Sequence, residues 1–379
     1  MSDPIRILNV VSIMSPGGIE NFVMNVYRNI DRDKIQFDFL THYGEKGLYD
    51  DEIEKMGGKI YQMPQIRDYE RAYYHRVFKY RAALIDFFKK HQEYHILHGH
   101  MTNTAAIYMP ISKKYGNVSC CIAHSHSTKS KGGMIGIMTD ILHKPVRRIA
   151  DNYFACSEEA AKWIFQKEDI ESGKVWVVKN GIETNRYKYN QDLRNEIRNK
   201  YSIEDKLIIG CVGRFRKEKN QVFLVDVLSE MLKKMPNTRL MLVGDGIYKE
   251  SVEEKARNKG IREQIIFMGN RNDVNILLQC MDIFVLPSYF EGVPTAAIEA
   301  QASGLPCVIS DTVKRDVKLT EGVKFLSLDA GSSIWAEEII KMHNKHTRGD
   351  QIEIVNNSGY GIESIAKQLE RFYLGLVES

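Results

Sequence analysis

Short apolar runs alternate along the chain with longer segments in which apolar residues recur every three or four positions. Val and Ile are frequent in the short runs, which is typical of strands buried on both faces of a sheet. In the first half, strands are predicted at residues 6–12, 36–41, 59–63, 95–98, 118–123, 152–155 and 174–178. Helices are predicted between them at residues 19–30, 69–91, 104–115 and 158–166. This alternation predicts βαβ units and a doubly wound parallel sheet.

A polar, charged stretch at residues 183–205 interrupts the alternation, which then starts again. In the second half, strands are predicted at residues 207–212, 239–243, 265–268, 283–286 and 307–309. Helices are predicted at residues 221–234, 248–259, 274–281, 294–303, 333–343 and 362–377. The pattern therefore predicts two α/β domains and a helical tail, which occupy residues 1–183, 184–361 and 362–379, with a hinge near 180–187. A chain of 379 residues suits two domains of ordinary size.

Composition and charge narrow the class of protein. Lys and Arg number 53 against 49 Asp and Glu, and the resulting net charge of +4 is too small to indicate nucleic-acid binding. Arg6, Asn9 and Ser12 interrupt the first apolar run, and no later stretch reaches the ~18 apolar residues that a membrane span needs. The six cysteines form no C-x-x-C pair and lie mostly in strand-like runs. We therefore expect buried, reduced thiols and a cytoplasmic protein.

The most informative segment is residues 286–304, with the sequence LPSYFEGVPTAAIEAQASG. After a predicted strand, Pro294 begins a helix at a position where its missing N–H costs nothing. The amides of the first turn, from Val293 to Ala296, are expected to form an anion site suited to phosphate. Glu299 lies among alanines, so its carboxylate could be held to accept hydrogen bonds from a ribose diol. The alternative is a solvated charge on the helix surface.

Two further turns follow strands of the second half. After residues 207–212, Arg214 and Lys219 place two cations at the start of the next helix, where they could clamp a diphosphate. A surface charge run is the other interpretation. Gly244 and Gly246 follow the next strand, but a lone G-x-G is weak evidence for a dinucleotide site.

Glycines and histidines end strands of the first half. Gly17 and Gly18 allow either a close backbone approach to a ligand or a simple tight turn. The histidines come in two pairs, His98 with His100 and His124 with His126. A metal site built from all four is one interpretation, although no carboxylate or cysteine lies at ligand spacing. We favour a single imidazole that donates a hydrogen bond to a substrate hydroxyl, and histidines without a role are the third possibility.

Residues 71–90 mix aromatic and basic side chains in a predicted helix, RAYYHRVFKYRAALIDFFKK. Such a helix can rest on an anionic membrane surface, with Lys and Arg at the headgroups and the aromatic rings below them. The other interpretation is that Val77, Leu84 and Phe88 simply pack onto the sheet.

These motifs closely resemble those of glycosyltransferase family 4, the retaining enzymes of the GT-B fold. Five features match in order: the turn at Pro16–Gly18, a strand-end histidine, Gly213-Arg214 with Lys219, Gly244-x-Gly246, and Glu291-x7-Glu299 within EGVPTAAIEA. The last is the most specific, because it is the E-x7-E signature of the family. Residues 17–25 and 124–128 are most similar to members encoded with bacterial capsule or exopolysaccharide genes. The resemblance implies two Rossmann-like, doubly wound parallel-sheet domains that face a central cleft, an acceptor-side domain first and a donor domain second, with the C-terminal helix crossing back to the first.

The resemblance also implies a role for each matching residue. Arg214 and Lys219 would neutralise the diphosphate of a nucleotide-sugar donor. Glu291 would contact the donor sugar, and Glu299 would bind the ribose hydroxyls. His126 would contact a donor hydroxyl or the reacting centre, with His124 as the competing assignment. The further donor-binding positions are Gly17, Gly18, Gly244, Gly246, Gly292, Val293, Pro294 and Thr295.

The implied reaction is transfer of a sugar, with retention, to a saccharide or a lipid-linked saccharide at the inner face of the membrane. UDP is the carrier that the family favours. Arg214, Lys219 and the helix N-terminus would stabilise the departing diphosphate in place of a divalent metal, and neither a metal nor a cofactor is expected. A nucleotide-sugar epimerase of similar fold and a non-catalytic nucleotide-sugar binder are the alternatives. No G-x-G-x-x-G follows a strand, which disfavours a nicotinamide oxidoreductase.

Overall fold

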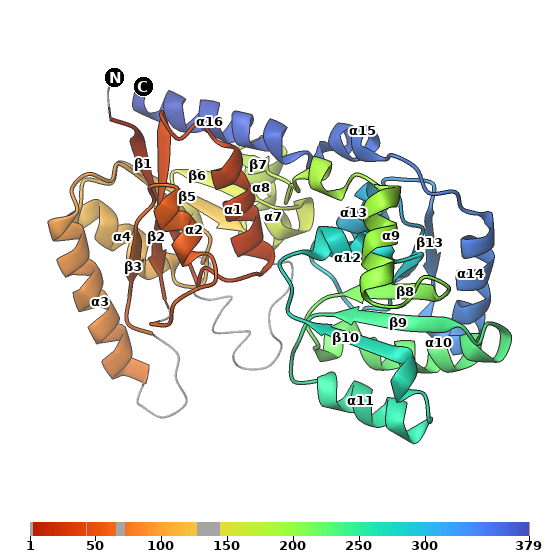
Figure 1. The fold of residues 1–379 in the computed structure, drawn as a ribbon. Coiled ribbons are helices and arrows are strands. Elements are labelled where there is room, and N and C mark those ends of the chain that lie inside the picture. The colour runs from red at the N-terminus through yellow and green to blue at the C-terminus, as the bar shows by residue number, and fades with distance from the viewer. Residues whose placement is uncertain (1–2, 43, 66–72, 127–144, 379) are drawn as a thin grey trace. The chain divides into compact units, whose positions relative to one another are not determined.

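The chain folds into two compact units in a computed structural model, which describes residues 3–42, 44–65, 73–126 and 145–378 (Figure 1). Unit 1 comprises Met1–Gly181 and Ile362–Ser379, and unit 2 comprises Ile182–Gly361. The tail of the chain therefore belongs with its beginning, as the resemblance implies.

Unit 1 is built on a parallel sheet of seven strands in the order β3-β2-β1-β4-β5-β6-β7. Its strands are β1 (Ile5–Val11), β2 (Ile35–Thr41), β3 (Ile60–Gln62), β4 (Ile96–Gly99), β5 (Cys120–Ser125), β6 (Asn152–Ala155) and β7 (Val175–Val177). Every neighbouring pair is parallel, which confirms the doubly wound sheet predicted from the alternation. The strand order reverses at β1, so the loops after β1 and β4 leave the sheet side by side, where ligands bind in folds of this kind.

Helices cover the sheet of unit 1. They are α1 (Gly18–Asn29), α2 (Asp50–Lys55), α3 (Tyr73–Lys90), α4 (Ala105–Tyr115), α6 (Val146–Ile149), α7 (Glu158–Ile164), α8 (Lys167–Glu171) and α16 (Ile362–Glu378). The last of these packs beside α1, and its apolar face, which includes Ile365, Leu369 and Tyr373, joins the same core as Ile7 and Phe22. The first residues of the helix predicted at 69–91 lie outside the described residues.

Unit 2 repeats the architecture with six parallel strands in the order β10-β9-β8-β11-β12-β13. Its strands are β8 (Leu207–Val212), β9 (Thr238–Val243), β10 (Ile265–Gly269), β11 (Ile283–Leu286), β12 (Cys307–Ser310) and β13 (Val323–Leu326). Its helices are α9 (Gln191–Lys200), α10 (Gln221–Lys234), α11 (Lys249–Asn258), α12 (Val274–Cys280), α13 (Thr295–Ala302), α14 (Gly331–Lys345) and α15 (Ile352–Val355). The strand order is that of a Rossmann fold, and it reverses at β8, between β9 and β11.

Unit 2 has three elements that were not predicted, α9, α15 and β13. The polar stretch at residues 183–205 contains α9, which the apolar pattern did not indicate. A narrow apolar stripe, Leu193 and Ile197, packs on the core of unit 2. Arg194 and Arg198 add a shared ion pair with Asp282. The sheet also gains an edge strand, β13, that the sequence pattern missed.

The structure bears on two predictions, one about the cysteines and one about membrane-spanning helices. All six cysteines are buried and free, as the strand-like runs around them predicted. Within the described residues, no helix combines the length and the apolar character that crossing a bilayer requires.

Candidate functional site

The loops after β8 and β11 meet at the point where the strand order of unit 2 reverses, because these two strands are neighbours in the sheet. The loop after β8 carries Arg214 and leads into a short 3-10 helix, Lys217–Lys219. The loop after β11 carries Ser288 and Glu291. Two sequence-predicted site residues, Lys219 and Glu291, are thereby brought together.

Lys219 and Glu291 form an ion pair at the centre of this region. The Lys219 Nζ donates to both carboxylate oxygens of Glu291, at 2.8 and 2.7 Å. Ser288 Oγ donates to Glu291 Oε1 at 2.6 Å. The Glu291 side chain is only 6% exposed, whereas that of Lys219 is 25% exposed. The carboxylate is therefore fixed and neutralised, and the Lys219 side chain stays partly exposed.

Backbone and amide contacts hold the two loops in register. The Tyr289 N–H donates to the Glu218 carbonyl at 2.8 Å, and Asn220 Nδ2 donates to the Pro287 carbonyl at 3.2 Å. On the other side, Gln221 Nε2 donates to the Arg214 carbonyl at 3.0 Å. The Arg214 side chain is exposed on this braced loop. A cation on a fixed backbone is well placed to meet an incoming anion, since little order is lost on binding.

The glutamate-to-glutamate segment continues into α13, which begins at Thr295, one residue later than predicted, with Pro294 as its N-cap. The Thr295 N–H bonds to the Val293 carbonyl at 2.9 Å, so this amide turns inward rather than joining an anion site with Val293 and Ala296. Gly292, Val293, Pro294 and Thr295 are all partly buried. Their proposed contact with phosphate stays a prediction.

Glu299 lies on α13 and is tied to the start of unit 2. The Tyr187 hydroxyl, from the 3-10 helix Thr184–Tyr187, donates to Glu299 Oε1 at 2.9 Å. Burial raises the pKa of Glu299 to about 7, and the Tyr187 hydrogen bond and the charge of Arg186 oppose this rise. A carboxylate with one hydrogen bond and a raised pKa is costly to keep charged. This geometry argues against a solvated helix charge and leaves the second oxygen for another donor.

The G-x-G turn after β9 has a structural role. A Cβ at Gly244 would lie 2.2 Å from the Gly213 carbonyl oxygen, and one at Gly246 would lie 2.5 Å from the Phe215 carbonyl oxygen. Both glycines have positive φ, +134° and +150°. The Phe215 N–H bonds to the Asp245 carbonyl at 2.9 Å, so the two loops pack backbone to backbone. The turn thus supports the loop that carries Arg214.

We expect Gly246→Ala to lower the free energy of unfolding by about 3 kcal/mol, because the new methyl group meets a carbonyl at a φ that L-residues rarely adopt. Gly260→Ala is the control, since Gly260 also has a positive φ, +68°, but faces open space. That control should cost about 1 kcal/mol. Urea unfolding measures both, and equal losses would show that the close packing contributes nothing.

In unit 1, the predicted site residues lie at the ends of β1, β4 and β5. Gly17 is the N-cap of α1 in an extended conformation, and its N–H donates to Asn21 Oδ1 at 3.2 Å. A Cβ at Gly18 would meet nothing within 4 Å, so space rather than packing surrounds it. The two histidine pairs end neighbouring strands, β4 and β5, as the sequence analysis supposed.

The four histidines form one stacked cluster. His124 and His126 have ring centroids 4.0 Å apart, and those of His98 and His100 are 4.3 Å apart. Hydrogen bonds join the pairs: His98 Nε2 lies 3.1 Å from His124 Nδ1, and His100 Nδ1 lies 2.9 Å from His126 Nε2. Burial lowers the pKa of His98 and of His126 to about 3, and it moves those of His100 and His124 in the same direction. All four rings are therefore neutral near pH 7.

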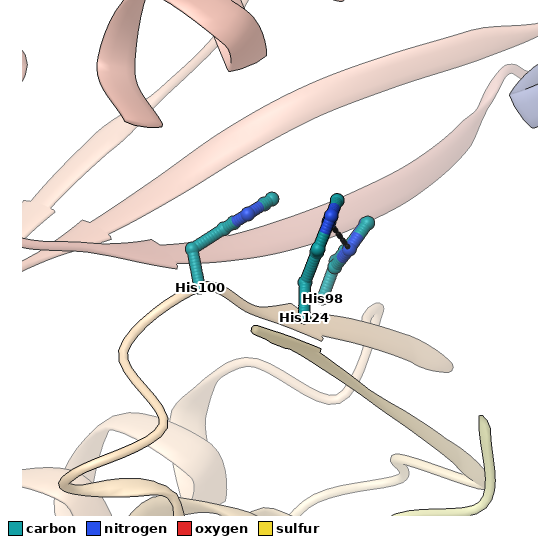
Figure 2. A group of neighbouring side chains, drawn as sticks. All are labelled: His98, His100 and His124. Atoms are coloured by element: carbon teal, nitrogen blue, oxygen red, sulfur yellow. Dashed lines mark hydrogen bonds between the residues drawn. The ribbon is translucent and has the colours of Figure 1, made fainter. Parts of the chain in front are cut away.

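Proximity alone would allow a metal ion among these rings. One ring nitrogen from each of His98, His100 and His124 falls within 4.8 Å of the others. Figure 2 shows the three rings side by side, with the His98–His124 hydrogen bond between them. A metal needs lone pairs that converge in the planes of the rings. Five of the six ring nitrogens of these residues have hydrogen-bond partners, His124 Nε2 being the exception, so a hydrogen-bonded cluster fits better than a metal site.

The sequence analysis did not identify several residues of these sites. Ser288, three positions before Glu291 and directly after a strand, could have been suspected from its place. Tyr187 lies 112 positions from its partner Glu299, and Tyr373 bonds His98 Nδ1 at 2.6 Å across 275 positions. No local pattern signals contacts of that length.

Family models match both halves of the chain. The model described as Glycosyltransferase Family 4 matches residues 16–186, and the one described as Glycosyl transferases group 1 matches residues 194–344. The first match contains the histidine cluster, and the second contains the Lys219–Glu291 pair.

Three relatives match over most of their lengths. EpsF of Bacillus subtilis strain 168, named as a glycosyltransferase, is 33% identical over 341 residues, which is 89% of this chain and 87% of EpsF. The capsular polysaccharide biosynthesis glycosyltransferase CapH of Staphylococcus aureus is 24% identical over 98% of this chain and 99% of its own. The UDP-Gal:alpha-D-GlcNAc-diphosphoundecaprenol alpha-1,3-galactosyltransferase of Escherichia coli is 24% identical over 78% of this chain and 79% of its own.

The fold also matches solved structures. The crystal structure of Anabaena HepE in complex with UDP and glucose superposes with a TM-score of 0.73 over 98% of this chain and 99% of HepE, at 17% identity. At that identity the match establishes the architecture of the chain and no more.

Proposed function

This chain is a glycosyltransferase of family 4 with the Rossmann-like units of the GT-B fold, and we propose that it transfers a sugar from a UDP-linked donor to a saccharide or lipid-linked saccharide acceptor. The observation that carries the proposal is the fixed Lys219–Glu291 pair at the strand-order reversal of unit 2. Two relatives support the choice of acceptor: one is named for capsular polysaccharide biosynthesis, and the name of the other includes a diphosphoundecaprenol-linked saccharide.

The chemistry follows from where charge develops. Breaking the bond between sugar and phosphate builds positive charge on the sugar ring and negative charge on the departing diphosphate. Lys219 keeps Glu291 neutralised with two of its three N–H groups, which leaves the third for a phosphate oxygen. Arg214, exposed on the adjacent loop, supplies a second cation. We propose that these two cations replace a divalent metal, that no cofactor takes part, and that the anomeric configuration is retained.

A three-part experiment tests this function. Thermal shifts with UDP-, GDP- and ADP-sugars identify the donor, and a UDP-sugar is expected to give the largest shift. Product analysis with and without a lipid-linked saccharide then separates transfer from epimerisation, because an epimerase converts the donor without an acceptor. Transfer should persist in EDTA. Donor binding without any turnover would instead identify a non-catalytic nucleotide-sugar binder.

The inner face of the plasma membrane is the proposed place of action. Phe78 on α3 is 71% exposed, and Lys79 and Arg81 beside it are exposed as well. An exposed aromatic ring next to cations suits an anionic bilayer surface, whereas Leu84 and Phe88 are buried in unit 1. Co-sedimentation with anionic vesicles, reduced in Phe78→Ser and absent with zwitterionic vesicles, would support this contact. Equal sedimentation of both proteins would contradict it.

A further inference from the structure

A chain of hydrogen bonds runs from Asn9 on β1 through His100 to His126. Asn9 Oδ1 lies 3.3 Å from His100 Nε2, and His100 Nδ1 lies 2.9 Å from His126 Nε2. Asn9 is 1% exposed and His100 is 4% exposed, so water does not substitute for either partner. In such a chain each donor fixes the role of the next ring.

The direction of the chain is set at its buried end. Asn9 Nδ2 lies 3.4 Å from the Ile7 carbonyl oxygen, which can only accept. Turning the amide over would set the Asn9 oxygen against that carbonyl oxygen. The amide therefore donates to Ile7, and its oxygen faces His100.

The remaining protons follow from this orientation. Since Asn9 Oδ1 accepts, His100 carries its proton on Nε2 and offers a lone pair at Nδ1. That lone pair accepts from His126, so His126 also carries its proton on Nε2. Its Nδ1 is left as an acceptor, and among the described residues this buried atom has no hydrogen-bond partner.

We propose that Asn9 is a positioning residue that acts through His100 to keep His126 in the Nε2–H form, so that His126 Nδ1 accepts a hydrogen bond from a hydroxyl of the sugar substrate. This inference rests on the proposed function for its ligand, because a sugar is rich in hydroxyl donors. It also reverses the polarity expected from the sequence, which had the histidine donating to the substrate.

Among the residues that the structure describes, few titratable groups face this chain of hydrogen bonds. His98 and His124 stack on His100 and His126, and Tyr373 of α16 bonds His98. The pKa of His100 is lowered by burial first and then by the neighbouring rings of His98 and His126. The second chain, Tyr373–His98–His124, has no fixed end, because a hydroxyl can donate or accept. Its direction is therefore not part of the proposal.

Asn9→Asp tests the proposal because protonation of the new side chain, which pH controls, would reverse the direction of the hydrogen bonds from residue 9 to His126. At low pH the pair formed by the new carboxyl group and His100 holds one extra proton, and His100 then donates from Nδ1. His126 must accept at Nε2 and moves its own proton to Nδ1. At high pH the extra proton leaves, the carboxylate accepts as Asn9 did, and the original form returns.

The first readout is ¹⁵N NMR of the histidine rings in the full chain without substrate, with His126 assigned through His126→Gln. We expect the proton on Nε2 in the natural protein, and on Nδ1 in Asn9→Asp at low pH. A proton on His126 Nδ1 in the natural protein would overturn the proposal. Because no sugar is needed, this readout stands even if the proposed function fails.

The second readout is the pH profile of kcat for transfer. The kcat of Asn9→Asp should be roughly tenfold lower than the natural value at low pH, because one hydrogen bond to a substrate hydroxyl is lost, and it should recover as pH rises. Asn9→Leu, which offers no acceptor, should be impaired at every pH. Asn117→Asp, exposed in unit 1, is the matched charge control and should follow the natural profile. A loss in Asn9→Asp that is equal at every pH would show a merely structural role and overturn the proposal.

Discussion

Lys219→Ala is expected to lower kcat/KM for sugar transfer by about 10²–10³-fold, the usual effect of removing one group that stabilises charge in a transition state. The Lys219 ammonium contacts Glu291 through two hydrogen bonds and is the partly exposed cation of the pair. Its removal takes away both the neutralising partner of Glu291 and a contact for the departing diphosphate. Steady-state kinetics with the donor found by the thermal-shift screen measures the loss.

Lys217→Ala provides the matched control. Lys217 lies in the same 3-10 helix, Lys217–Lys219, and is exposed. Its loss removes an equal charge two positions away and should change kcat/KM by less than twofold. Equal losses in the two variants would mean that general charge around the loop, rather than the Lys219 ammonium, attracts the donor.

A second variant separates chemistry from stability. Lys219→Ala leaves the Glu291 carboxylate with the Ser288 hydroxyl as its remaining hydrogen-bond partner among the described residues, which should cost about 1–3 kcal/mol of unfolding free energy. Adding Glu291→Gln removes the stranded charge. The double variant should therefore regain most of the stability and none of the activity. Because Glu291 is itself a predicted donor contact, transfer by the double variant is compared with transfer by Glu291→Gln alone. Equal rates in these two would show that Lys219 acts only by holding Glu291.

The elements that sequence predicted well are those whose signal is local. The strands at Asn152–Ala155, Leu207–Val212 and Ile283–Leu286 were predicted with their observed bounds, because each is a short apolar run between polar turns. By contrast, α9 has only two apolar residues in its core-facing stripe, Leu193 and Ile197. Arg194 and Arg198 supplement that stripe by attaching the helix to Asp282 and to backbone carbonyls near the end of α12. So short an apolar stripe among charged residues gives only a weak helix signal in the sequence.

The candidate site divides in the same way. The Glu291–Glu299 spacing and the Arg214–Lys219 turn are local motifs, and the structure places Lys219 against Glu291. The residues that support these motifs come from other loops. Tyr187 bonds Glu299. The hydroxyls of Ser310 and Thr312 both donate to the Ser288 carbonyl, each at 2.7 Å. The direction of the histidine chain depends on one amide orientation on another strand, which no spacing rule encodes.

Glu299 gives the second large effect, and it depends on pH. The pKa of Glu299 in the empty protein is raised to about 7 by burial, with the Tyr187 hydrogen bond opposing the rise. A ribose diol can donate hydrogen bonds to both oxygens of a carboxylate, whereas a protonated acid carries an O–H donor on one of its oxygens. Donor affinity should therefore rise with pH through about 7 and level off above it. Isothermal titration with the donor across this range measures the midpoint.

Tyr187→Phe should move that midpoint to higher pH, because the lost hydroxyl was lowering the pKa of Glu299. Tyr189→Phe is the control, since its hydroxyl bonds the exposed Gln191 instead. If both variants keep the natural midpoint, the Tyr187 contact does not tune the carboxylate. An upward shift in both would point to a general change in the loop.

Glu299→Gln tests the same carboxylate through stability. A folded pKa near 7, above the ordinary value of 4.5, means that the folded protein holds the extra proton more tightly than the unfolded chain. Natural stability should then fall as pH rises from about 4.5 to 7, by about 1–3 kcal/mol in all. Glutamine cannot ionise and keeps the Tyr187 bond, so Glu299→Gln should be more stable than the natural protein at pH 8 and equal to it near pH 4.5. Its donor affinity should be lower, because the amide offers one acceptor oxygen in place of two, and independent of pH between those limits, because glutamine does not titrate. A variant that is both less stable at pH 8 and unchanged in donor affinity would assign Glu299 to packing alone.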